Sequence, residues 1–399
     1  MYKVYKMQVK PNEYLDKITT LSNNLYNLAL YNVRQNYFNN KTFLNYYGNY
    51  PLCKENENYK ALPSQAAQQV IKQVDNAFKS FFKANKDYQK HPNKYKARPK
   101  IPKYKEKGSK SIITIPSQTI YLKENYIQFP KSKYKLFIGE LKLDKIVEVK
   151  IKPYHKYYEI CIIYEEKEKE HVEQNEHYIG IDIGVNNFIT VTNNIGKNPF
   201  IVKGGIIKSI NQYYNKRKAK LMSYVGNRGT SNRIQKLTRK RNNKISNFLH
   251  NTSKHLIDYC MKNNISNIVI GYNEGWKQEV NTGKRNNQNF VNIPFRTLIN
   301  QIKYKAEEIG IKIIIHEESY TSKCDALSLE DLKHKEKGQY FGKRIKRGMF
   351  KSRTGEILNA DINGSLNILR KVIGNDFVSL LDRGLVKNPF IVKYDKDFC

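Results

Sequence analysis

The clearest hydrophobic pattern lies in YIGIDIGVNNFITVT, residues 178–192, and it predicts two strands joined by a tight turn. In the first strand, isoleucines alternate with Gly180, Asp182 and Gly184. A carboxylate inside an apolar strand is costly to bury unless a cation compensates it, and a bound metal ion is the usual reason. Asp182 is therefore a candidate metal ligand. An acid at an exposed strand edge is the alternative, and these residues alone leave both open.

The C-terminal half continues as alternating strands and helices. Apolar runs predict strands at 199–205, 265–271 and 311–318, and helical spacing predicts helices over 208–254, 294–309 and from residue 359. This order predicts an α/β domain of the ribonuclease H-like type, with the first strand in the middle of the sheet. The next two strands to its side, 265–271 and 311–318, are expected to end at the same edge of the sheet as the strand that carries Asp182.

The N-terminal half combines helices with short strands. Residues 2–10 alternate as a strand, and helical spacing predicts helices over 11–39 and 64–84, joined by a polar connection. Short alternating runs between 111 and 165 predict a small antiparallel β-barrel or sandwich. An acidic linker, 166–177, then leads into the C-terminal half.

Charge narrows the class of partner. The chain carries 71 Lys and Arg against 36 Asp and Glu, a net charge of +35 that suggests a polyanionic partner. The 30 Tyr and 17 Phe scattered among the bases suit stacking on unpaired bases. From Lys208 to Lys254 there are thirteen Lys and Arg and no acid. Because a solvated helical face usually intersperses acids, we expect this segment to face a nucleic-acid backbone.

Several other classes of protein are disfavoured. No apolar run reaches the length of a membrane span, and the start, MYKVYKMQVK, lacks a signal-peptide core. The five cysteines, at 53, 161, 260, 324 and 399, include no CxxC pair, so neither a disulfide framework nor a zinc ribbon is indicated. We expect a reduced, cytoplasmic, nucleoid-associated protein of a prokaryote, without membrane contact.

A second acid, Asp361, lies at the start of the helix predicted in NADINGSLNILRK, residues 359–371. Two-metal phosphodiester cleavage needs about three carboxylates that converge on Mg²⁺ ions roughly 4 Å apart. Asp182 on the first strand and Asp361 on the last helix fit such a site. The helix dipole also favours an acid at a helix start, so Asp361 alone does not establish catalysis.

Five motifs carry a resemblance to a known family. They are IGIDIGVNN (179–187), NQNFVNIPF (287–295), ESYTSK (318–323), KRIKRGMF (343–350) and NADINGSLNILRK (359–371). In this order they resemble the TnpB/OrfB proteins of insertion-sequence transposons, relatives of the compact type V CRISPR nucleases. The motifs span the C-terminal half and are specific together, whereas the N-terminal half resembles the family only in its layout.

This resemblance implies an RNA-guided DNA endonuclease that depends on Mg²⁺ (or Mn²⁺) and cuts next to a short adjacent motif. Its partners would be a guide RNA and a double-stranded DNA target, with one protein monomer per RNA. The implied domains are a wedge-like β-barrel (1–10 and 97–170), a helical recognition lobe (11–96), a RuvC-like nuclease domain (176–318 and 355–375, with basic helices at 206–262), an insertion that binds target nucleic acid (319–354) and a C-terminal tail (376–399).

The middle catalytic glutamate of the family is displaced in this chain. Most relatives carry it at the end of the strand that is NIVIG here, where this chain has Gly271. The adjacent strand ends in Glu317 and Glu318, which are expected at the same sheet edge, and Glu274 follows Gly271 by three residues. We expect Glu318 or Glu317 to complete the metal site, with Glu274 and an inactive site as the alternatives.

The family's zinc ribbon is reduced to Cys324, because 324–358 holds no second cysteine and His334 alone does not complete a four-ligand site. We therefore expect no zinc, and a basic loop or hairpin in its place. Together with the basic helices and the loop after Gly271, this segment supplies the expected nucleic-acid contacts. These are Arg217, Lys220, Arg233, Arg239, Lys240, Arg241, Lys277, Lys284, Arg285, Lys323, Lys343, Arg344, Lys346 and Arg347.

Two other functions stay open at this point. The missing glutamate at position 271 is compatible with a guide-loaded protein that binds target DNA without cutting it, as a repressor does. Older names for the family suggest a transposase that joins strands itself, but the chain has no obvious strand-transfer architecture beyond the shared nuclease core.

Overall fold

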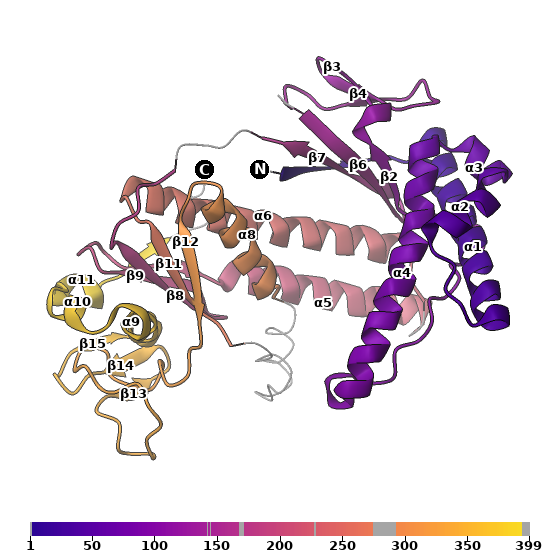
Figure 1. Ribbon diagram of the computed structural model, residues 1–399. Helices are drawn as coiled ribbons and strands as arrows, with labels where there is room; N and C mark the ends of the chain where they lie inside the picture. The colour runs from indigo at the N-terminus through magenta and orange to yellow at the C-terminus, as the bar shows by residue number, and fades with distance from the viewer. Residues whose placement is uncertain are drawn as a thin grey trace. The chain divides into compact units, whose positions relative to one another are not determined.

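The computed structural model describes residues 2–141, 143, 145–166, 171–226, 229–273 and 293–392 (Figure 1). The chain divides into two compact units, Met1–Lys167 and Glu168–Cys399. The boundary falls in the acidic segment where the sequence predicts a linker. The helices and strands below carry the labels of Figure 1.

Unit 1 contains two long helices whose apolar stripes the sequence predicts. The helices are α1 (Glu13–Asn40), α2 (Tyr46–Lys54), α3 (Glu57–Ala61) and α4 (Ser64–Lys90), with 3-10 turns at η1 (Pro92–Lys94) and η2 (Ser117–Thr119). The short helices α2 and α3 lie in the connection that the sequence left without structure. The side chains of Asn45 and Asn56 accept hydrogen bonds from backbone N–H groups in their first turns. Asparagines that are typical of loops therefore act here as helix caps.

The strands of unit 1 form two antiparallel sheets, so the predicted small barrel or sandwich stays a prediction in its detailed arrangement. They are β1 (Tyr2–Val9), β2 (Ile113–Pro116), β3 (Tyr121–Lys123), β4 (Tyr126–Gln128), β5 (Lys135–Phe137), β6 (Lys145–Tyr154) and β7 (Tyr157–Glu165). One sheet has the order β1-β7-β6-β2 and the other the order β3-β4-β5. In the described residues β1 and β2 remain edges, because β3, β4 and β5 have three residues each and pair only among themselves.

Unit 2 is built on a six-stranded sheet. Its strands are β8 (Tyr178–Ile183), β9 (Asn187–Asn193), β10 (Phe200–Lys203), β11 (Asn267–Gly271), β12 (Lys312–His316) and β16 (Phe390–Val392). The order is β12-β11-β8-β9-β10-β16, with β8 parallel to β11 and antiparallel to β9, and β11 parallel to β12. The prediction that the first strand lies mid-sheet is confirmed, and β11 and β12 on one side of β8 run parallel to it and end at the same edge, as expected.

The predicted C-terminal tail is wrong in one respect, because β16 is part of this sheet and pairs in parallel with β10. The three apolar residues FIV are too few to reveal a period. They form a strand because they pair with β10, which lies far away in the sequence.

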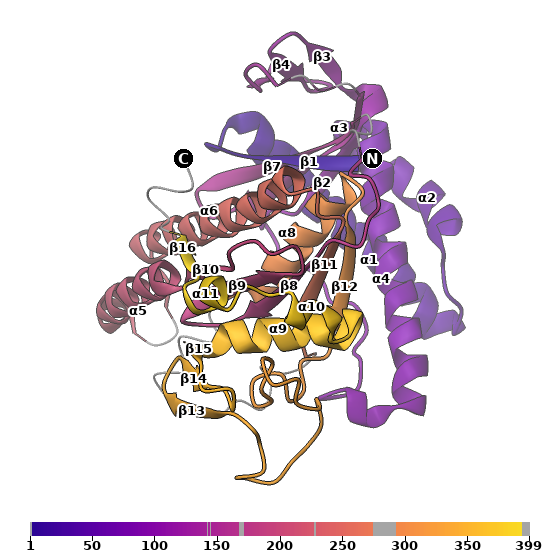
Figure 2. The ribbon, with the colours of Figure 1, turned by 90° about the vertical axis from the view of Figure 1, so that its left-hand side faces the viewer.

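Helices cover both faces of the sheet (Figure 2). They are α5 (Gly205–Val225), α6 (Asn232–Lys262), α8 (Phe295–Glu307), α9 (Ala360–Ile373), α10 (Asp376–Ser379) and α11 (Arg383–Lys387). Ile268 and Ile270 of β11 pack into the core formed with α6 and α8, whereas Val269 packs into the core formed with α9. The run NIVIG is apolar throughout because successive side chains enter opposite cores. None of the described helices is long and apolar enough to cross a membrane.

The segment predicted as a basic loop or hairpin contains a three-stranded antiparallel sheet. Its strands are β13 (Lys343–Lys346), β14 (Met349–Lys351) and β15 (Ile357–Asn359), in the order β13-β14-β15. The last strand runs directly into α9. The insertion and the helix that carries Asp361 are therefore continuous in the chain.

Candidate active site

Three carboxylates come together at the sheet edge where β8, β11 and β12 end. Asp182 is the next-to-last residue of β8, Glu318 follows β12 by two residues, and Asp361 lies in the first turn of α9. Burial raises the pKa of Asp182 well above its usual value, although part of the residue reaches solvent. The charges of Asp361 and Glu318 raise this pKa further, and that of Arg344 lowers it. Since β8 is an interior strand, the edge-acid alternative for Asp182 is wrong.

Small residues allow α9 to lie close enough for this meeting. A Cβ on Gly180 would stand 2.7 Å from the Ser365 backbone oxygen, and a Cβ on Gly364 would stand 2.6 Å from Oδ2 of Asp182. The hydroxyl of Ser365 donates a hydrogen bond of 2.7 Å to the Gly180 carbonyl oxygen, so the helix is bound to the strand where the two approach. The glycines beside Asp182 and Asp361 thus serve the contact between β8 and α9.

The end of β12 directs one of its two glutamates toward the site. Oε2 of Glu318 lies 3.3 Å from the position of a Cβ on Gly271, and its backbone N–H donates to Oδ1 of Asn273 over 3.0 Å. Burial raises the pKa of Glu318, and Lys371 opposes this shift. Glu317 is exposed, and its carboxylate accepts a hydrogen bond from the Ser319 hydroxyl. Between the two predicted glutamates, the structure brings Glu318 to Asp182.

Asp361 is held by a residue that the sequence analysis did not single out. The buried Asn187 donates from Nδ2 to Oδ2 of Asp361 over 2.8 Å, and its own Oδ1 accepts from Nζ of Lys203 over 2.8 Å. The ammonium group can only donate, so it fixes the orientation of the Asn187 amide. The start of α9 is capped by Asn359, whose Oδ1 accepts from the Asp361 N–H over 2.9 Å. The Asp361 carboxylate is therefore directed into the site instead of capping its helix.

The donor chemistry suits a hard divalent cation. Asp182, Glu318 and Asp361 offer only carboxylate oxygens, which Mg²⁺ and Mn²⁺ prefer. The raised pKa of Asp182 reflects first its burial and then the nearby charges of Asp361 and Glu318. In the conformation that the structure describes, no group of three or more His, Cys, Asp or Glu side chains within the described ranges is arranged to hold a metal ion. The three carboxylates are thus neighbours that do not yet converge on one point.

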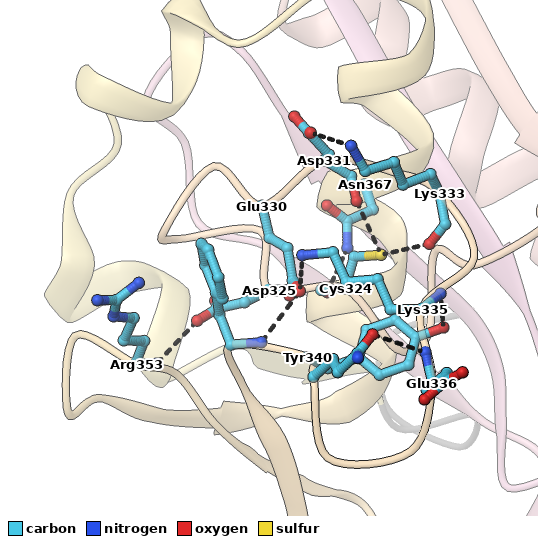
Figure 3. Close-up of polar contacts among 12 residues, drawn as sticks. Cys324, Asp325, Glu330, Asp331, Lys333, Lys335, Glu336, Tyr340, Arg353 and Asn367 are labelled. Carbon is cyan, nitrogen blue, oxygen red and sulfur yellow. Dashed lines mark hydrogen bonds and ion pairs between the residues drawn. The ribbon is translucent and has the colours of Figure 1, made fainter.

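The segment after Cys324 is organised by a buried carboxylate, as Figure 3 shows. The side chain of Glu330 is fully buried. Its Oε2 accepts from the N–H of Asp325 over 2.8 Å, and its Oε1 accepts from Nζ of Lys335 over 2.7 Å and from the N–H of Phe341 over 3.0 Å. Glu330 therefore joins three separated points of the loop, as a structural metal ion does in a ribbon.

A polar stripe of α9 holds the same loop. Nδ2 of Asn367 donates to the Cys324 carbonyl oxygen over 2.7 Å, and Nη2 of Arg370 donates to that of Glu330 over 3.0 Å. Both side chains are buried. Because Asp361 begins this helix, the carboxylate site and the loop share one rigid support.

Basic side chains surround a hollow of about 630 Å³ beside this loop. Lys323, Lys335, Lys343 and Arg344 line it, together with Tyr340 and other residues of the loop. Of the predicted nucleic-acid contacts in this segment, Lys323, Lys343, Arg344, Lys346 and Arg347 are all exposed. Arg344 also acts on the charge of Asp182, so this basic surface reaches the carboxylate site.

The basic residues of α5 and α6 divide into two groups. Arg217, Lys220, Arg233 and Lys240 are exposed, and Arg239 is half-buried. Arg241 is half-buried and donates from Nε and Nη2 to Oδ1 of Asn211 over 2.9 and 2.8 Å, so it links α6 to α5. Glu274, Lys277, Lys284 and Arg285, which the sequence also predicts as site residues, lie outside the described residues.

Two family models match this chain. Residues 161–277 match OrfB_IS605, described as a probable transposase, and residues 295–368 match the Cas12f1-like TNB domain. The first match contains Asp182 and the second contains Glu318 and Asp361. These matches confirm the resemblance that the five motifs indicate.

Two curated proteins are similar to this chain in sequence. The TnpB-like protein ORF457 of Acidianus two-tailed virus is 27% identical over 206 residues, which cover 49% of this chain and 41% of that protein. The CRISPR-associated endodeoxyribonuclease Cas12f1 of Sulfoacidibacillus thermotolerans is 29% identical over 203 residues, 48% of this chain and 44% of that protein. The matched region thus spans less than half the length of either relative.

The fold is similar to that of a chain in the cryo-EM structure of a Cas12f1–sgRNA–target DNA complex. The TM-score is 0.51 at 16% sequence identity, and the match covers 89% of this chain and 82% of that chain. At this identity the likeness concerns the fold alone.

Proposed function

From its resemblance to the TnpB/OrfB proteins, we propose that this chain is a transposon-associated, RNA-guided DNA endonuclease. It would hydrolyse phosphodiester bonds in a double-stranded target next to a short adjacent motif. The observation that carries the proposal is the meeting of Asp182, Glu318 and Asp361 at one sheet edge, because nothing in the stability of the fold requires three neighbouring carboxylates there.

The proposal assigns the two units to the parts expected in the family. The sheet with β8 at its centre would be the RuvC-like nuclease domain, and β13 to β15 would belong to an insertion that contacts target nucleic acid. In unit 1, the helices would form the recognition lobe and the four-stranded sheet the wedge. We keep the expectation of one protein monomer for each RNA.

Asp182, Glu318 and Asp361 would hold Mg²⁺ or Mn²⁺ in this function. When bound, such a cation supplies an activated water and stabilises charge on the leaving oxygen. The chain's own residues prepare the ligands for this task. Asn187 and Lys203 hold the Asp361 carboxylate in orientation, and Lys371 and Arg344 moderate the repulsion among the acids.

The exposed cations would bind the nucleic acids. Lys343, Arg344 and neighbouring bases line the hollow next to the carboxylates, where they can hold the phosphates of a DNA strand near Asp182. The acid-free segment from Lys208 to Lys254, which covers most of α5 and α6, would bind the backbone of the guide RNA or its duplex with the target strand.

A second candidate function is guided DNA binding without cleavage. It is favoured by Gly271, which stands where most relatives carry the glutamate, and by the carboxylates not converging in the described conformation. This protein would form a target-specific complex and leave the DNA intact even in excess Mg²⁺ or Mn²⁺.

One experiment separates these functions. The protein is expressed with its native flanking DNA and purified with its RNA, the RNA is sequenced, and a plasmid carrying the matching target is incubated with the complex and Mg²⁺. We expect guided cleavage that Asp182→Ala abolishes. Guided binding without product favours the second candidate, cleavage that persists in Asp182→Ala refutes the site, and absence of any RNA refutes guided action.

A further inference from the structure

A groove of about 300 Å³ lies between α5 and α6, which run side by side in unit 2 (Figures 1 and 2). Aromatic, aliphatic and cationic side chains share its walls. Those that matter here are Ile210, Tyr213, Tyr214, Leu237, Lys240 and Lys244. The charges of this segment predict a basic face, and the groove adds an aromatic and apolar surface between the basic side chains.

The groove is fixed by hydrogen bonds between its two helices. The hydroxyl groups of Tyr214 and Thr238 are 3.1 Å apart, and the guanidinium group of Arg241 donates twice to Asn211. Tyr213 is not used in this way, and its side chain is 61% exposed. The hydrogen bonds hold the two helices at a fixed spacing, and the exposed ring of Tyr213 is available for stacking, at the modest entropy cost of an aromatic side chain.

The charge of the groove selects the partner. Lys240 and Lys244 are both exposed and stand one helical turn apart on the same wall, where they repel each other. The segment from Lys208 to Lys254 contains no acid to compensate them. The two lysines favour a partner with closely spaced negative charges, and the exposed ring of Tyr213 favours a partner with flat rings that can stack. An unpaired polynucleotide strand has both properties.

We propose that this groove takes an unpaired nucleotide of the RNA partner, with its base stacked on Tyr213 and adjacent phosphates bound by Lys240 and Lys244. We commit to RNA because folded RNA presents unstacked bases in loops, bulges and ends before any target is bound, whereas DNA exposes unpaired bases only in the strand that the guide displaces from the target. The inference rests on the proposed function, since it assumes an RNA partner, and it assigns that partner a contact that is independent of the cleavage site.

The test uses the full-length protein without copurified RNA and three fluorescent probes. These are a single-stranded oligoadenylate RNA, the same sequence as DNA, and an RNA duplex of equal length. We expect Tyr213→Ala to weaken binding of the single-stranded RNA by about 10-fold, the size of one lost base–aromatic stack, and Tyr213→Trp to retain it. Binding of the duplex should not change, because its bases are already stacked.

Tyr224→Ala is the matched control, since Tyr224 lies on the same helix, is 72% exposed and does not line the groove. In addition, Lys240→Ala and Lys244→Ala should each reduce the slope of log K against log salt by about 0.7. Equal affinities of Tyr213→Ala and the unchanged protein overturn the groove assignment but leave RNA binding intact. An equal loss with Tyr224→Ala, or a larger loss with the DNA probe, also overturns it. Failure of the unchanged protein to bind any RNA instead refutes the proposed function.

Discussion

Oε2 of Glu318 lies 3.3 Å from the position of a Cβ on Gly271. A carboxylate from the end of β12 thus reaches the end of the neighbouring strand β11, where the resemblance to the TnpB/OrfB proteins places the middle glutamate. Glu317 is exposed and bonded to Ser319, so the two adjacent acids have different surroundings. Because only Glu318 lies at the site, substitutions of Glu318 and Glu317 should have different effects on cleavage.

We expect Glu318→Gln to reduce guided cleavage by at least about 100-fold, because in the proposed function it removes one charge that would hold the cation, while Glu317→Gln keeps activity within a few-fold. Cleavage rates of the two purified complexes on the same plasmid measure this. The two variants are matched controls, since each changes one carboxylate to an amide at adjacent positions. A larger loss with Glu317→Gln contradicts the assignment.

The assignment can also be tested by moving the acid. A Cβ on Gly271 would stand 2.4 Å from Cδ1 and 2.9 Å from Cγ1 of Ile368, so Gly271→Glu needs Ile368→Ala, which removes both atoms. We expect the combination Gly271→Glu, Ile368→Ala and Glu318→Gln to recover part of the cleavage lost in Glu318→Gln alone. The variant that carries only Ile368→Ala and Glu318→Gln is the control and should remain inactive.

The sequence predicted the sheet that positions this site because its strands are long enough to show a period. The alternation around Asp182 and the apolar run NIVIG placed β8 and β11 correctly, and parallel pairing brought their ends together. β16 and the short helices α2 and α3 were missed, since three to nine residues carry little periodicity. For β16, the pairing partner β10 also lies far away in the sequence.

The support of the site was less predictable than its carboxylates. Asn187 follows a turn, where asparagine is common. Nothing in the local sequence therefore indicates that its amide contacts Asp361, 174 residues later. Likewise, alternation could not decide between Glu317 and Glu318, because both follow the last residue of β12. The direction of a side chain beyond a strand end depends on tertiary contacts such as the one from Asn273.

Removing the charge of Asp182 is expected to stabilise the metal-free protein. Its pKa is raised in the folded state above the ordinary 3.8, so the folded protein binds more protons than the unfolded chain as pH rises from 3.8 toward the raised pKa. Stability therefore falls with increasing pH in that window, so a carboxyl group at this position destabilises the fold at neutral pH. We expect Asp182→Asn to melt at a higher temperature than the unchanged protein at neutral pH in EDTA, with a smaller difference near pH 4.

Differential scanning fluorimetry with and without Mg²⁺ measures this effect. Mg²⁺ should raise the melting temperature of the unchanged protein and have little effect on Asp182→Asn, because a cation that binds the folded state stabilises it. Asp376→Asn, at an exposed position, is the control and should show neither effect. A lower melting temperature for Asp182→Asn at neutral pH contradicts the pKa shift.

Asn187 is expected to act on metal affinity through Asp361. Asn187→Ala leaves the Asp361 carboxylate without its 2.8 Å hydrogen bond and Lys203 without its acceptor. We expect the Mg²⁺ concentration for half-maximal cleavage to rise about 10- to 100-fold, as for other residues that orient ligands, with much of the rate restored at high Mg²⁺. Asn186→Ala, at the exposed neighbouring position, should leave the requirement unchanged. A fall in rate at all Mg²⁺ concentrations would instead indicate a direct catalytic role.

Glu330 is expected to replace a metal ion in holding the loop after Cys324. Glu330→Gln leaves Lys335, whose side chain is only 15% exposed, opposite a neutral group, and a broken buried ion pair costs about 3–5 kcal/mol. The double variant Glu330→Gln with Lys335→Gln should be less destabilised than the single one, and Glu336→Gln, at an exposed position, should be neutral. Denaturant unfolding measures these differences. The fold of the unchanged protein should be insensitive to EDTA and carry no stoichiometric zinc. Zinc at one ion per chain, with unfolding on chelation, would show that a metal and not Glu330 organises this segment.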